Sequence, residues 1–303
     1  MIRSLHELRK HVSRLSPKTI AVAVAEADHT LRAVGEARRR GWADAVLVGD
    51  EAAIRQRLES LELEPDGFDI VHCSGGQEAA AEAVAMVRAG DADLVLKGAV
   101  STAVLMHAVL DREAGLRTGG LLSDVFLIDY TGSGPGRLVG ITDGGINPTP
   151  DLKQKEAILR NAVDVFHALG VEEPLVAVLS GTEKPTPKLQ GSMDAVRLVE
   201  SHEAGDDLDC VVDGPLAMDL ALSAEAAASK GFESPVAGRA DILLFPTLEA
   251  ANITAKAIQY WTSRDPGHVV VGASVPVLIP SRAESARARL NAIALGSLLA
   301  ERG

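Results

Sequence analysis

Short, almost continuously apolar runs alternate with longer amphipathic stretches along the chain. Apolar runs placed between helical patterns are typical of strands in a parallel sheet that helices cover on both faces. We expect strands at residues 19–25, 44–49, 68–73, 93–98, 125–130, 138–142, 175–180, 210–213, 241–245 and 269–272. We expect helices at residues 29–40, 51–60, 77–89, 103–113, 151–169, 193–200, 220–230, 248–261 and from 283 onward. This alternation predicts an α/β protein with doubly wound sheets.

The end of the chain is too short to form a core of its own. After residue 270 it offers one strand and one helix, which must complete an existing sheet. We therefore expect two doubly wound α/β domains with a cleft between them. The first is discontinuous, 1–129 with 271–303, and the second, 130–270, is inserted into it. Ligands of such folds collect at the carboxyl ends of the strands.

The composition excludes several classes of partner. A net charge of -12 opposes general binding to nucleic acid or to an anionic membrane, and 3% aromatic residues leave few surfaces for base stacking. No apolar run approaches the roughly 18 residues that span a bilayer. The amphipathic start, residues 2–15, is interpreted as a docked first helix rather than a targeting segment. An anionic ligand would need a local cationic pocket.

The two cysteines, Cys73 and Cys210, both lie at the ends of strand-like runs. We expect buried, reduced thiols, which suits a cytoplasmic protein. Neither cysteine has metal-ligating neighbours in the sequence, and we expect no metal site.

A first candidate anion site lies between an expected strand and an expected helix. Lys97 supplies charge, Gly98 permits a close approach of the backbone, and Ser101 and Thr102 supply hydroxyl groups. The alternative is a Ser/Thr helix cap beside a solvated lysine.

A second candidate anion site lies where the apolar run 275–280 meets a helical pattern that begins at Ala283. Ser281 and Arg282 would then stand at a helix N-terminus, where backbone amides attract anions and a guanidinium group adds a planar charge. The alternative is that Ser281 and Glu284 form a capping box, in which the hydroxyl and carboxylate satisfy backbone amides. The two roles are compatible.

Other polar motifs surround the next two expected strands. Arg117, Thr118 and Ser123 come close before the strand at 125–130, and Asn147 follows the strand after it. A structural turn is the default interpretation for each, but their place at strand ends keeps ligand binding open. The Gly/Pro-rich segment 132–137 precedes a strand rather than a helix, so we interpret it as a turn between strands and not as a dinucleotide loop.

Seven motifs carry a resemblance that covers essentially the whole chain in order. They are Lys97-Gly98, Gly115-Leu-Arg117, Thr142-Asp143 with Asn147-Pro148, Asp213-Gly-Pro215, Val236-Ala-Gly238, Glu249-Ala250 with Asn252, and Ser281-Arg282 with Ser285. Each is weak alone, but the ordered set resembles the phosphate acetyltransferase and phosphate butyryltransferase family. The first two motifs favour the butyryl branch.

The resemblance implies a reversible reaction in which acyl-CoA and phosphate give acyl phosphate and CoA. It implies a cleft between two α/β domains of the isocitrate/isopropylmalate dehydrogenase-like fold, no tightly bound cofactor, and a cytoplasmic homodimer whose partners are acyl-CoA and inorganic phosphate. Ser281 and Arg282 match the catalytic pair of the family, Arg282 toward phosphate and Ser281 toward the phosphate or the thioester. The expected substrate-binding residues are Lys97, Ser101, Thr102, Arg117, Thr118, Ser123 and Asn147.

The sequence also departs from the family pattern. Ala288 stands where the acetyl branch has an aspartate, and His107 where that branch has an arginine. Asp124 and Ala251 replace a histidine and a glycine of the butyryl branch. The proton-transfer group is therefore open, with His107 as one candidate. Two alternatives are a non-catalytic CoA or acyl-phosphate binding protein and an NAD- and metal-dependent dehydrogenase of the same fold.

Overall fold

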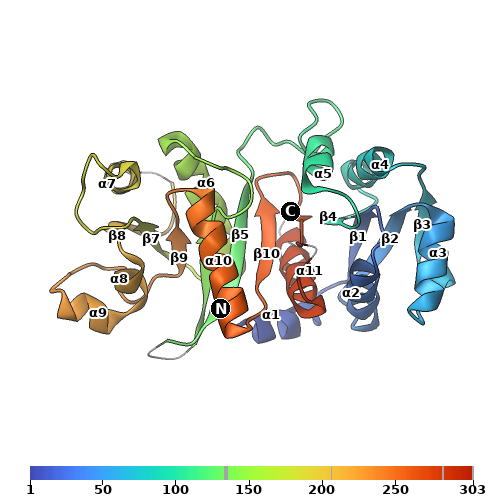
Figure 1. Cartoon of the computed structure of the whole chain (residues 1–303), viewed down its shortest axis with the longest axis horizontal. Coiled ribbons are helices and arrows are strands. Elements are labelled where there is room, and N and C mark those ends of the chain that lie inside the picture. Colours follow the sequence, from blue (N-terminus) through green and yellow to red (C-terminus); the bar gives the residue numbers. More distant parts are fainter. Residues whose placement is uncertain (133–135, 206, 282, 302–303) are drawn as a thin grey trace. The chain divides into compact units, whose positions relative to one another are not determined.

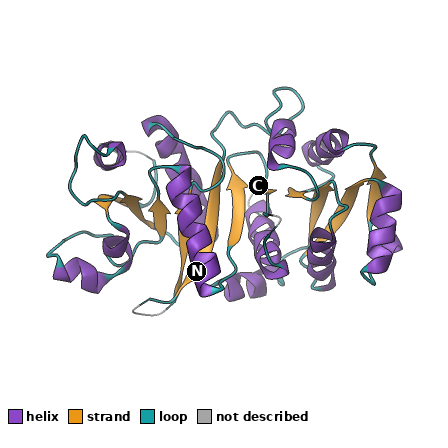
Figure 2. Ribbon diagram, in the orientation of Figure 1, coloured by secondary structure: helices purple, strands orange, loops and turns teal. Residues whose placement is uncertain are grey.

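The computed structural model describes residues 1–132, 136–205, 207–281 and 283–301. The chain forms two compact units, one of residues 8–120 and 267–303 and the other of residues 1–7 and 121–266. In both units strands lie between helices, as Figure 2 shows, which confirms the expected α/β class. The domain boundaries expected from the sequence, 1–129 with 271–303 and 130–270, stay a prediction.

The unit of residues 8–120 and 267–303 contains a doubly wound sheet with the strand order β3-β2-β1-β4-β11-β10. The strands are β1 (Lys18–Ala23), β2 (Ala43–Gly49), β3 (Asp69–His72), β4 (Leu94–Lys97), β10 (Gly267–Val271) and β11 (Val277–Leu278). The helices are α2 (Asp28–Arg39), α3 (Glu51–Ser60), α4 (Gly76–Ala89), α5 (Thr102–Val109) and α11 (Ala286–Ala300). Helices α4 and α5 pack together on one face of the sheet, and α2 and α11 pack together on the other (Figure 1).

The unit of residues 1–7 and 121–266 contains a sheet with the order β5-β6-β9-β7-β8. The strands are β5 (Ser123–Tyr130), β6 (Arg137–Thr142), β7 (Leu175–Leu179), β8 (Val211–Leu216) and β9 (Ile242–Leu244). The helices are α6 (Leu152–Ala168), α7 (Gln190–Glu203), α8 (Met218–Leu222), α9 (Ala224–Ser229) and α10 (Leu248–Thr262). An apolar cluster joins β5, β6, β7 and β9 to helices α8 and α10.

Helix α1 (Leu5–Val12) confirms the expected docked first helix. Its apolar residues Leu5, Leu8 and Val12 are all buried, with exposed fractions of 2% or less. Cys73 and Cys210 are buried thiols, as expected, and burial raises the pKa of Cys73. None of the described helices combines the length and the apolar character needed to cross a membrane.

The expected parallel arrangement is wrong at two places. Strand β10 runs antiparallel to β11, and β5 runs antiparallel to β6. The β5–β6 pair agrees with the expected turn between strands, although residues 133–135 of that turn lie outside the described residues. Short connections make these pairs antiparallel, because a parallel pair needs a crossover of about a dozen residues.

Two expected helices also differ from the structure. The helix expected at 220–230 is divided into α8 and α9, because Ser223 has an extended backbone and its side chain accepts a hydrogen bond from the Ala226 amide. The helix expected from Ala283 begins at Ala286. In both cases a serine cap sets the start of the helix.

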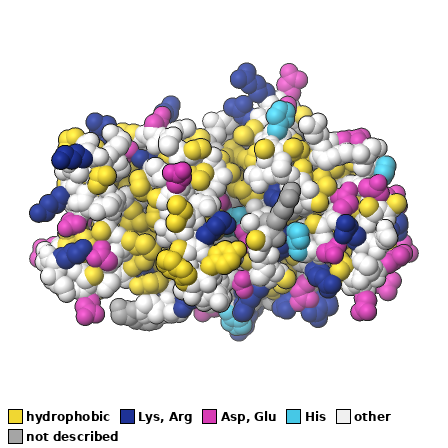
Figure 3. Space-filling view, viewed as in Figure 1, with side chains coloured by type: hydrophobic (Ala, Val, Ile, Leu, Met, Phe, Trp, Pro, Cys, Tyr) yellow, Lys and Arg dark blue, Asp and Glu magenta, His cyan; other side chains and the backbone are white. Residues whose placement is uncertain are grey.

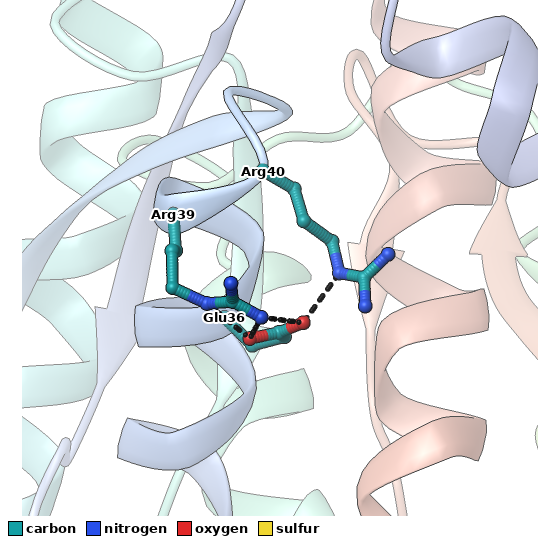
Figure 4. A network of polar contacts seen from close by, with 3 residues as sticks. All are labelled: Glu36, Arg39 and Arg40. Carbon is teal, nitrogen blue, oxygen red and sulfur yellow. Dashed lines mark hydrogen bonds and ion pairs between the residues drawn. The ribbon is translucent and has the colours of Figure 1, made fainter.

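A small ion network closes the C-terminal end of α2 (Figure 4). The Glu36 carboxylate accepts hydrogen bonds from Arg39 at 2.6–2.8 Å and from Arg40 at 2.5 Å. Burial alone would raise the pKa of Glu36, but these hydrogen bonds lower it. Because both arginines are exposed to water, the network adds little to stability.

Candidate active site

The sheet of the unit formed by 8–120 and 267–303 has its topological switch point between β1 and β4. The chain runs outward from β1 to β2 and β3, and then returns to place β4 on the other side of β1. In open α/β sheets, ligands bind outside the carboxyl ends of the strands at such a point. The candidate anion loop at 97–102 begins there, because Lys97 is the last residue of β4 and is paired with Ala23 of β1.

Gly98 allows two backbone segments to meet at this switch point. Its amide donates to the Ala23 carbonyl at 2.9 Å, and the Ala99 amide donates to the Val24 carbonyl at 2.6 Å. A Cβ atom at position 98 would lie 2.0 Å from the Val24 carbonyl oxygen. The close approach expected at Gly98 is therefore an approach to the chain itself.

The polar residues of the 97–102 loop have different environments. Lys97 is buried, with 4% exposed, and its Nζ donates to the Val100 carbonyl at 3.2 Å. It is thus not the solvated lysine of the alternative interpretation. Ser101 does cap α5, since its Oγ accepts from the Val104 amide at 3.2 Å, and Thr102 is the exposed first residue of that helix.

Ser281 lies in the loop that follows β11, and β11 lies beside β4 with Leu278 opposite Leu96. Its carbonyl oxygen accepts hydrogen bonds from Arg289 Nη2 at 2.7 Å and from the Glu284 amide at 3.1 Å. Both candidate anion loops therefore leave adjacent strands of one sheet at the same end. The second residue of the expected catalytic pair, Arg282, lies outside the described residues.

The proposed capping role of Ser281 is wrong. The N-cap of α11 is Ser285, whose hydroxyl accepts from the Ala288 amide at 3.0 Å. Glu284 nevertheless reaches back, as the capping-box pattern suggests, because the Ser281 backbone hydrogen-bonds its carboxylate. The pattern thus forms a turn before the helix and not the start of the helix itself.

Arg117 and Thr118 are tied to the end of β10 in the same unit. Arg117 forms an isolated antiparallel bridge with Ala273, and Thr118 Oγ1 donates to the Gly272 carbonyl at 2.8 Å. Both side chains are exposed. The Thr118 hydroxyl therefore shapes a turn in this structure, and the Arg117 side chain faces water.

A group of charged residues that the sequence interpretation missed surrounds the Ser281 loop. Arg289 is 2% exposed, and burial lowers its pKa while the Glu284 charge opposes that shift. Burial lowers the pKa of His29, and the charges of Arg289 and Lys97 lower it further, which favours the neutral imidazole. Burial alone would raise the pKa of Glu284, but His268, the Ser281 backbone and Arg289 together lower it. These side chains place both positive and negative charge beside the strand ends.

A signal for Arg289 was present in the sequence. Helix α11 is buried at positions 288 and 289 and at every position from 291 to 298. Most of these residues are apolar or small, and the charged one is Arg289. An arginine among such residues marks a buried charge that must have partners.

Ser123 and Asn147 lie in the other unit and are engaged by neighbours there. Ser123, at the start of β5, is fully buried and its Oγ accepts from Asn161 Nδ2 at 2.8 Å. Asn147 donates from its backbone and from its Nδ2 to Asp143 Oδ2, at 2.9 and 2.6 Å, and from Nδ2 to the Leu122 carbonyl at 2.8 Å. The Asp143 carboxylate also accepts three more backbone amides, so it organises this turn.

The positions that depart from the family pattern are distributed over both units. His107 is exposed on α5 and lines a cavity of about 490 Å³ between α4 and α5, together with Gln77 and Asp111. Ala251 is fully buried in the apolar cluster around α10, so its methyl group packs in the core. Asp124 is buried beside Gly145, where a Cβ atom would lie 2.5 Å from Asp124 Oδ2.

Within the described ranges, no group of three or more histidine, cysteine, aspartate or glutamate side chains is arranged to hold a metal ion. Of the carboxylates at 206–209, residue 206 lies outside those ranges, and Asp207 pairs with Arg160 at 2.6 Å. The ionisable groups that interact with one another there are Lys97, Arg289, Glu284 and His29, near the carboxyl ends of β1, β4 and β11.

The doubly wound fold, with polar and charged side chains at the carboxyl ends of its strands, defines an α/β protein with a candidate ligand site at that edge. A family described as "Phosphate acetyl/butaryl transferase" matches residues 4–82 and 75–297. The phosphate butyryltransferase of Clostridium acetobutylicum is 41% identical over 300 residues, which is 99% of both chains. The phosphate acetyltransferase of Rhizobium meliloti is 41% identical over 267 residues, which is 88% of this chain and 84% of that one. The chain belongs to the phosphate acetyl/butyryl transferase family, a family of acyltransferases, as the motifs indicated.

Solved structures agree with this membership. A branched-chain phosphotransacylase from Enterococcus faecalis has a TM-score of 0.82 and 28% identity, over 93% of this chain and 99% of that one. The fold alone extends further: a 4-hydroxythreonine-4-phosphate dehydrogenase from Klebsiella pneumoniae has a TM-score of 0.56 and 12% identity, over 95% of this chain and 99% of that one. The expected dehydrogenase-like fold class is thereby confirmed.

Proposed function

We propose that the protein catalyses reversible transfer of a short acyl group between CoA and inorganic phosphate. One observation carries this proposal: 41% identity to a phosphate butyryltransferase along 99% of both chains. Similarity to butyryltransferases and acetyltransferases alike supports the general reaction, acyl-CoA plus phosphate giving acyl phosphate plus CoA. The reaction needs no tightly bound cofactor, because the acyl group passes directly between two substrates that bind and then leave as products.

The reaction requires an oxygen of hydrogen phosphate to attack the thioester carbonyl carbon. The carbon–sulfur bond then breaks, its electron pair goes to sulfur, and the proton of hydrogen phosphate ends on the CoA thiol. Two negatively charged substrates must approach each other, and negative charge gathers on the carbonyl oxygen and then on sulfur. The repulsion and the developing charge raise the free-energy barrier of the reaction. Fixed positive charge and hydrogen-bond donors in the site lower this barrier.

We assign the catalytic pair to Ser281 and Arg282. Arg282 holds phosphate through its guanidinium fork, and Ser281 orients phosphate or hydrogen-bonds the thioester. Ser281 lies in the loop that follows β11, and β11 is paired with β4, whose last residue is the buried Lys97; this supports the assignment. The proton could pass through His107, which is exposed on α5.

We assign substrate binding to both units. The substrate-binding set is Lys97, Ser101, Thr102, Arg117, Thr118, Ser123 and Asn147. Lys97 is the strongest member, because a lysine with 4% exposed contributes a charge that water screens little. Asn147 Nδ2 can donate to a substrate only if its present contacts with Asp143 and Leu122 rearrange. Ser123 is fully buried, so a substrate reaches its hydroxyl only if the residues around it move.

Phosphate-dependent release of CoA tests the reaction class. Acetyl-, propionyl-, butyryl- and isobutyryl-CoA are each incubated with the protein, and free CoA is detected with a thiol reagent. We expect release only when phosphate is present, with chloride at equal ionic strength as the control. Release without phosphate would indicate a hydrolase. CoA binding with no release would indicate a binding protein.

We also propose that two copies of the chain form a homodimer through α10. Large apolar side chains on this helix are exposed: Ile253 at 68%, Tyr260 at 67% and Trp261 at 86%. Hydrophobic side chains gather over α10 on the face that Figure 3 shows. Exposed apolar patches of this kind are typical of protein interfaces.

Sedimentation equilibrium should give twice the chain mass of 31.7 kDa, and a lower mass after Trp261→Glu. A wild-type species of 31.7 kDa would contradict the dimer.

A further inference from the structure

A buried group of ionisable residues surrounds the backbone of Ser281. Arg289, in the first turn of α11, is 2% exposed, and Glu284, in the loop before that helix, is 8% exposed. His268 of β10 is 4% exposed and completes the group. The unit of residues 8–120 and 267–303 contains these three residues and Ser281. Nothing in the catalytic assignment above uses Arg289, Glu284 or His268.

Both polar groups of the Ser281 backbone are held by this arrangement. Its carbonyl accepts from Arg289 Nη2 at 2.7 Å and from the Glu284 amide at 3.1 Å. Its amide hydrogen-bonds the Glu284 carboxylate. Charged partners make hydrogen bonds that are shorter and stronger than neutral ones. The backbone of Ser281 is therefore held by two charged side chains, Arg289 of α11 and Glu284 of the loop.

Glu284 is held in turn by its neighbours. Its Oε1 lies 3.5 Å from Nε2 of His268, and the positive charge of Arg289 is also within electrostatic reach. The carboxylate thus lies between two basic side chains that come from β10 and α11. This places the Ser281 backbone relative to a strand of the sheet, β10, and to helix α11, and not only relative to its own loop.

The arrangement is a costly way to build a stable loop. Among the described residues, Arg289 Nε and Glu284 Oε2 are buried with no hydrogen-bond partner. Buried charges lose their hydration, and apolar residues of similar volume often serve stability as well or better. Ala292 and Ile293, which lie on the same helix face as Arg289, are apolar residues at buried positions of this kind. What an apolar residue cannot supply is the hydrogen bond to the Ser281 carbonyl.

We propose that Arg289, oriented by Glu284 and His268, is a positioning residue that fixes Ser281 for phosphate acyl transfer. The proposal rests on the proposed function and adds a residue to it. Arg289 does not touch the substrates. It acts through the Ser281 carbonyl, because a reacting group that is displaced by about 1 Å loses roughly a hundredfold in rate.

Arg289→Met tests this role, because methionine keeps the length and apolar stem of the side chain and removes the donor. We expect kcat to fall about 10- to 100-fold while KM for acyl-CoA stays within about 3-fold, since positioning affects the chemical step more than ground-state binding. Arg289→Lys should recover part of kcat by restoring a donor. Arg287→Met is the matched control: it removes the same charge from the same helix turn, at an exposed position. Its kcat should stay within about 2-fold of the wild type.

Arg289→Met takes from Glu284 the arginine charge that the described part of the chain places near it, and the loss of a buried partner is strongly destabilising. The double variant Glu284→Gln/Arg289→Met removes both charges together, so it is expected to fold and still to lose kcat. Amide hydrogen exchange of residues 279–285 gives a second measurement that does not depend on activity. We expect exchange there to be at least 10-fold faster in both Arg289 variants and unchanged in Arg287→Met.

These outcomes separate the two proposals. A folded Arg289→Met protein with near wild-type kcat and unchanged exchange at 279–285 would overturn the positioning role. An equal loss of kcat in Arg287→Met would overturn it too, because the effect would follow charge alone. If the wild type releases no CoA with phosphate, the proposed function fails, whereas the exchange measurement still decides whether Arg289 fixes the loop.

Discussion

Arg282→Ala is expected to lower kcat/KM for the phosphate-dependent release of CoA by about 10²- to 10³-fold. Losses of this size follow when one preorganised donor to transition-state charge is removed from an enzyme site. Arg282 lies outside the described residues, and the expectation rests on its place beside Ser281 in the proposed catalytic pair. Initial rates over a matrix of phosphate and acyl-CoA concentrations would show whether phosphate use is the step that suffers.

Arg282→Lys distinguishes the geometry of the side chain from its charge. An ammonium group is a point charge and cannot replace the planar fork of a guanidinium group, so this variant should also be impaired. Arg287→Ala serves as the matched control, since it removes an exposed arginine five residues away. Circular dichroism should show unchanged secondary structure in all three variants. Near wild-type kinetics of Arg282→Ala would remove this residue from the site.

Much of the fold could be predicted because its signals are local. The helix expected at 51–60 is α3, and most expected strands differ from the observed ones by one or two residues at each end. Buried strands and amphipathic helices have different periods, so their alternation is visible in the sequence. The direction of β10 was missed, although the short connection between β10 and β11 makes an antiparallel pair the arrangement to expect.

The start of α11 shows how two local signals can compete. Ser281 with Glu284, and Ser285 with its own first turn, both fit helix-start patterns. The structure uses Ser285 as the cap, while the Ser281 backbone is engaged by Arg289 and Glu284. The Ser285 cap sets the start of the helix, and the contact between Arg289 and Ser281, eight residues apart, is not visible in either local pattern.

The candidate site was predicted in part. Lys97 and Ser281 follow adjacent strands, as the rule on strand carboxyl ends indicates. His29, His268 and Arg289 were not expected, because they come from separate elements and meet only after folding. Gly98 was expected to admit a ligand, yet it makes room for the Val24 carbonyl. Chemistry that depends on long-range contacts leaves little trace in local patterns.

Lys155→Met is expected to lower the free energy of unfolding by about 3–5 kcal/mol. Lys155 of α6 and Asp194 of α7 form an ion pair at 2.6 Å, with side-chain exposed fractions of 4% and 6%. Asp194 Oδ1 also accepts from Gln190 Nε2 at 2.7 Å. Removing the lysine leaves a buried carboxylate with this single neutral donor, and breaking a buried pair in this way carries a penalty of that size. Urea unfolding followed by circular dichroism measures the change.

The double variant Lys155→Met/Asp194→Leu decides whether the penalty comes from the stranded charge or from lost packing. We expect it to recover most of the lost stability, because replacing both members of a buried pair by apolar residues is often neutral or stabilising. Lys153→Met, at an exposed position on the same helix, should change stability by less than about 0.5 kcal/mol. If the double variant is as unstable as Lys155→Met, the lysine acts through packing. If the single variant is as stable as the wild type, the pair makes no net contribution, and the connection between α6 and α7 rests on other contacts.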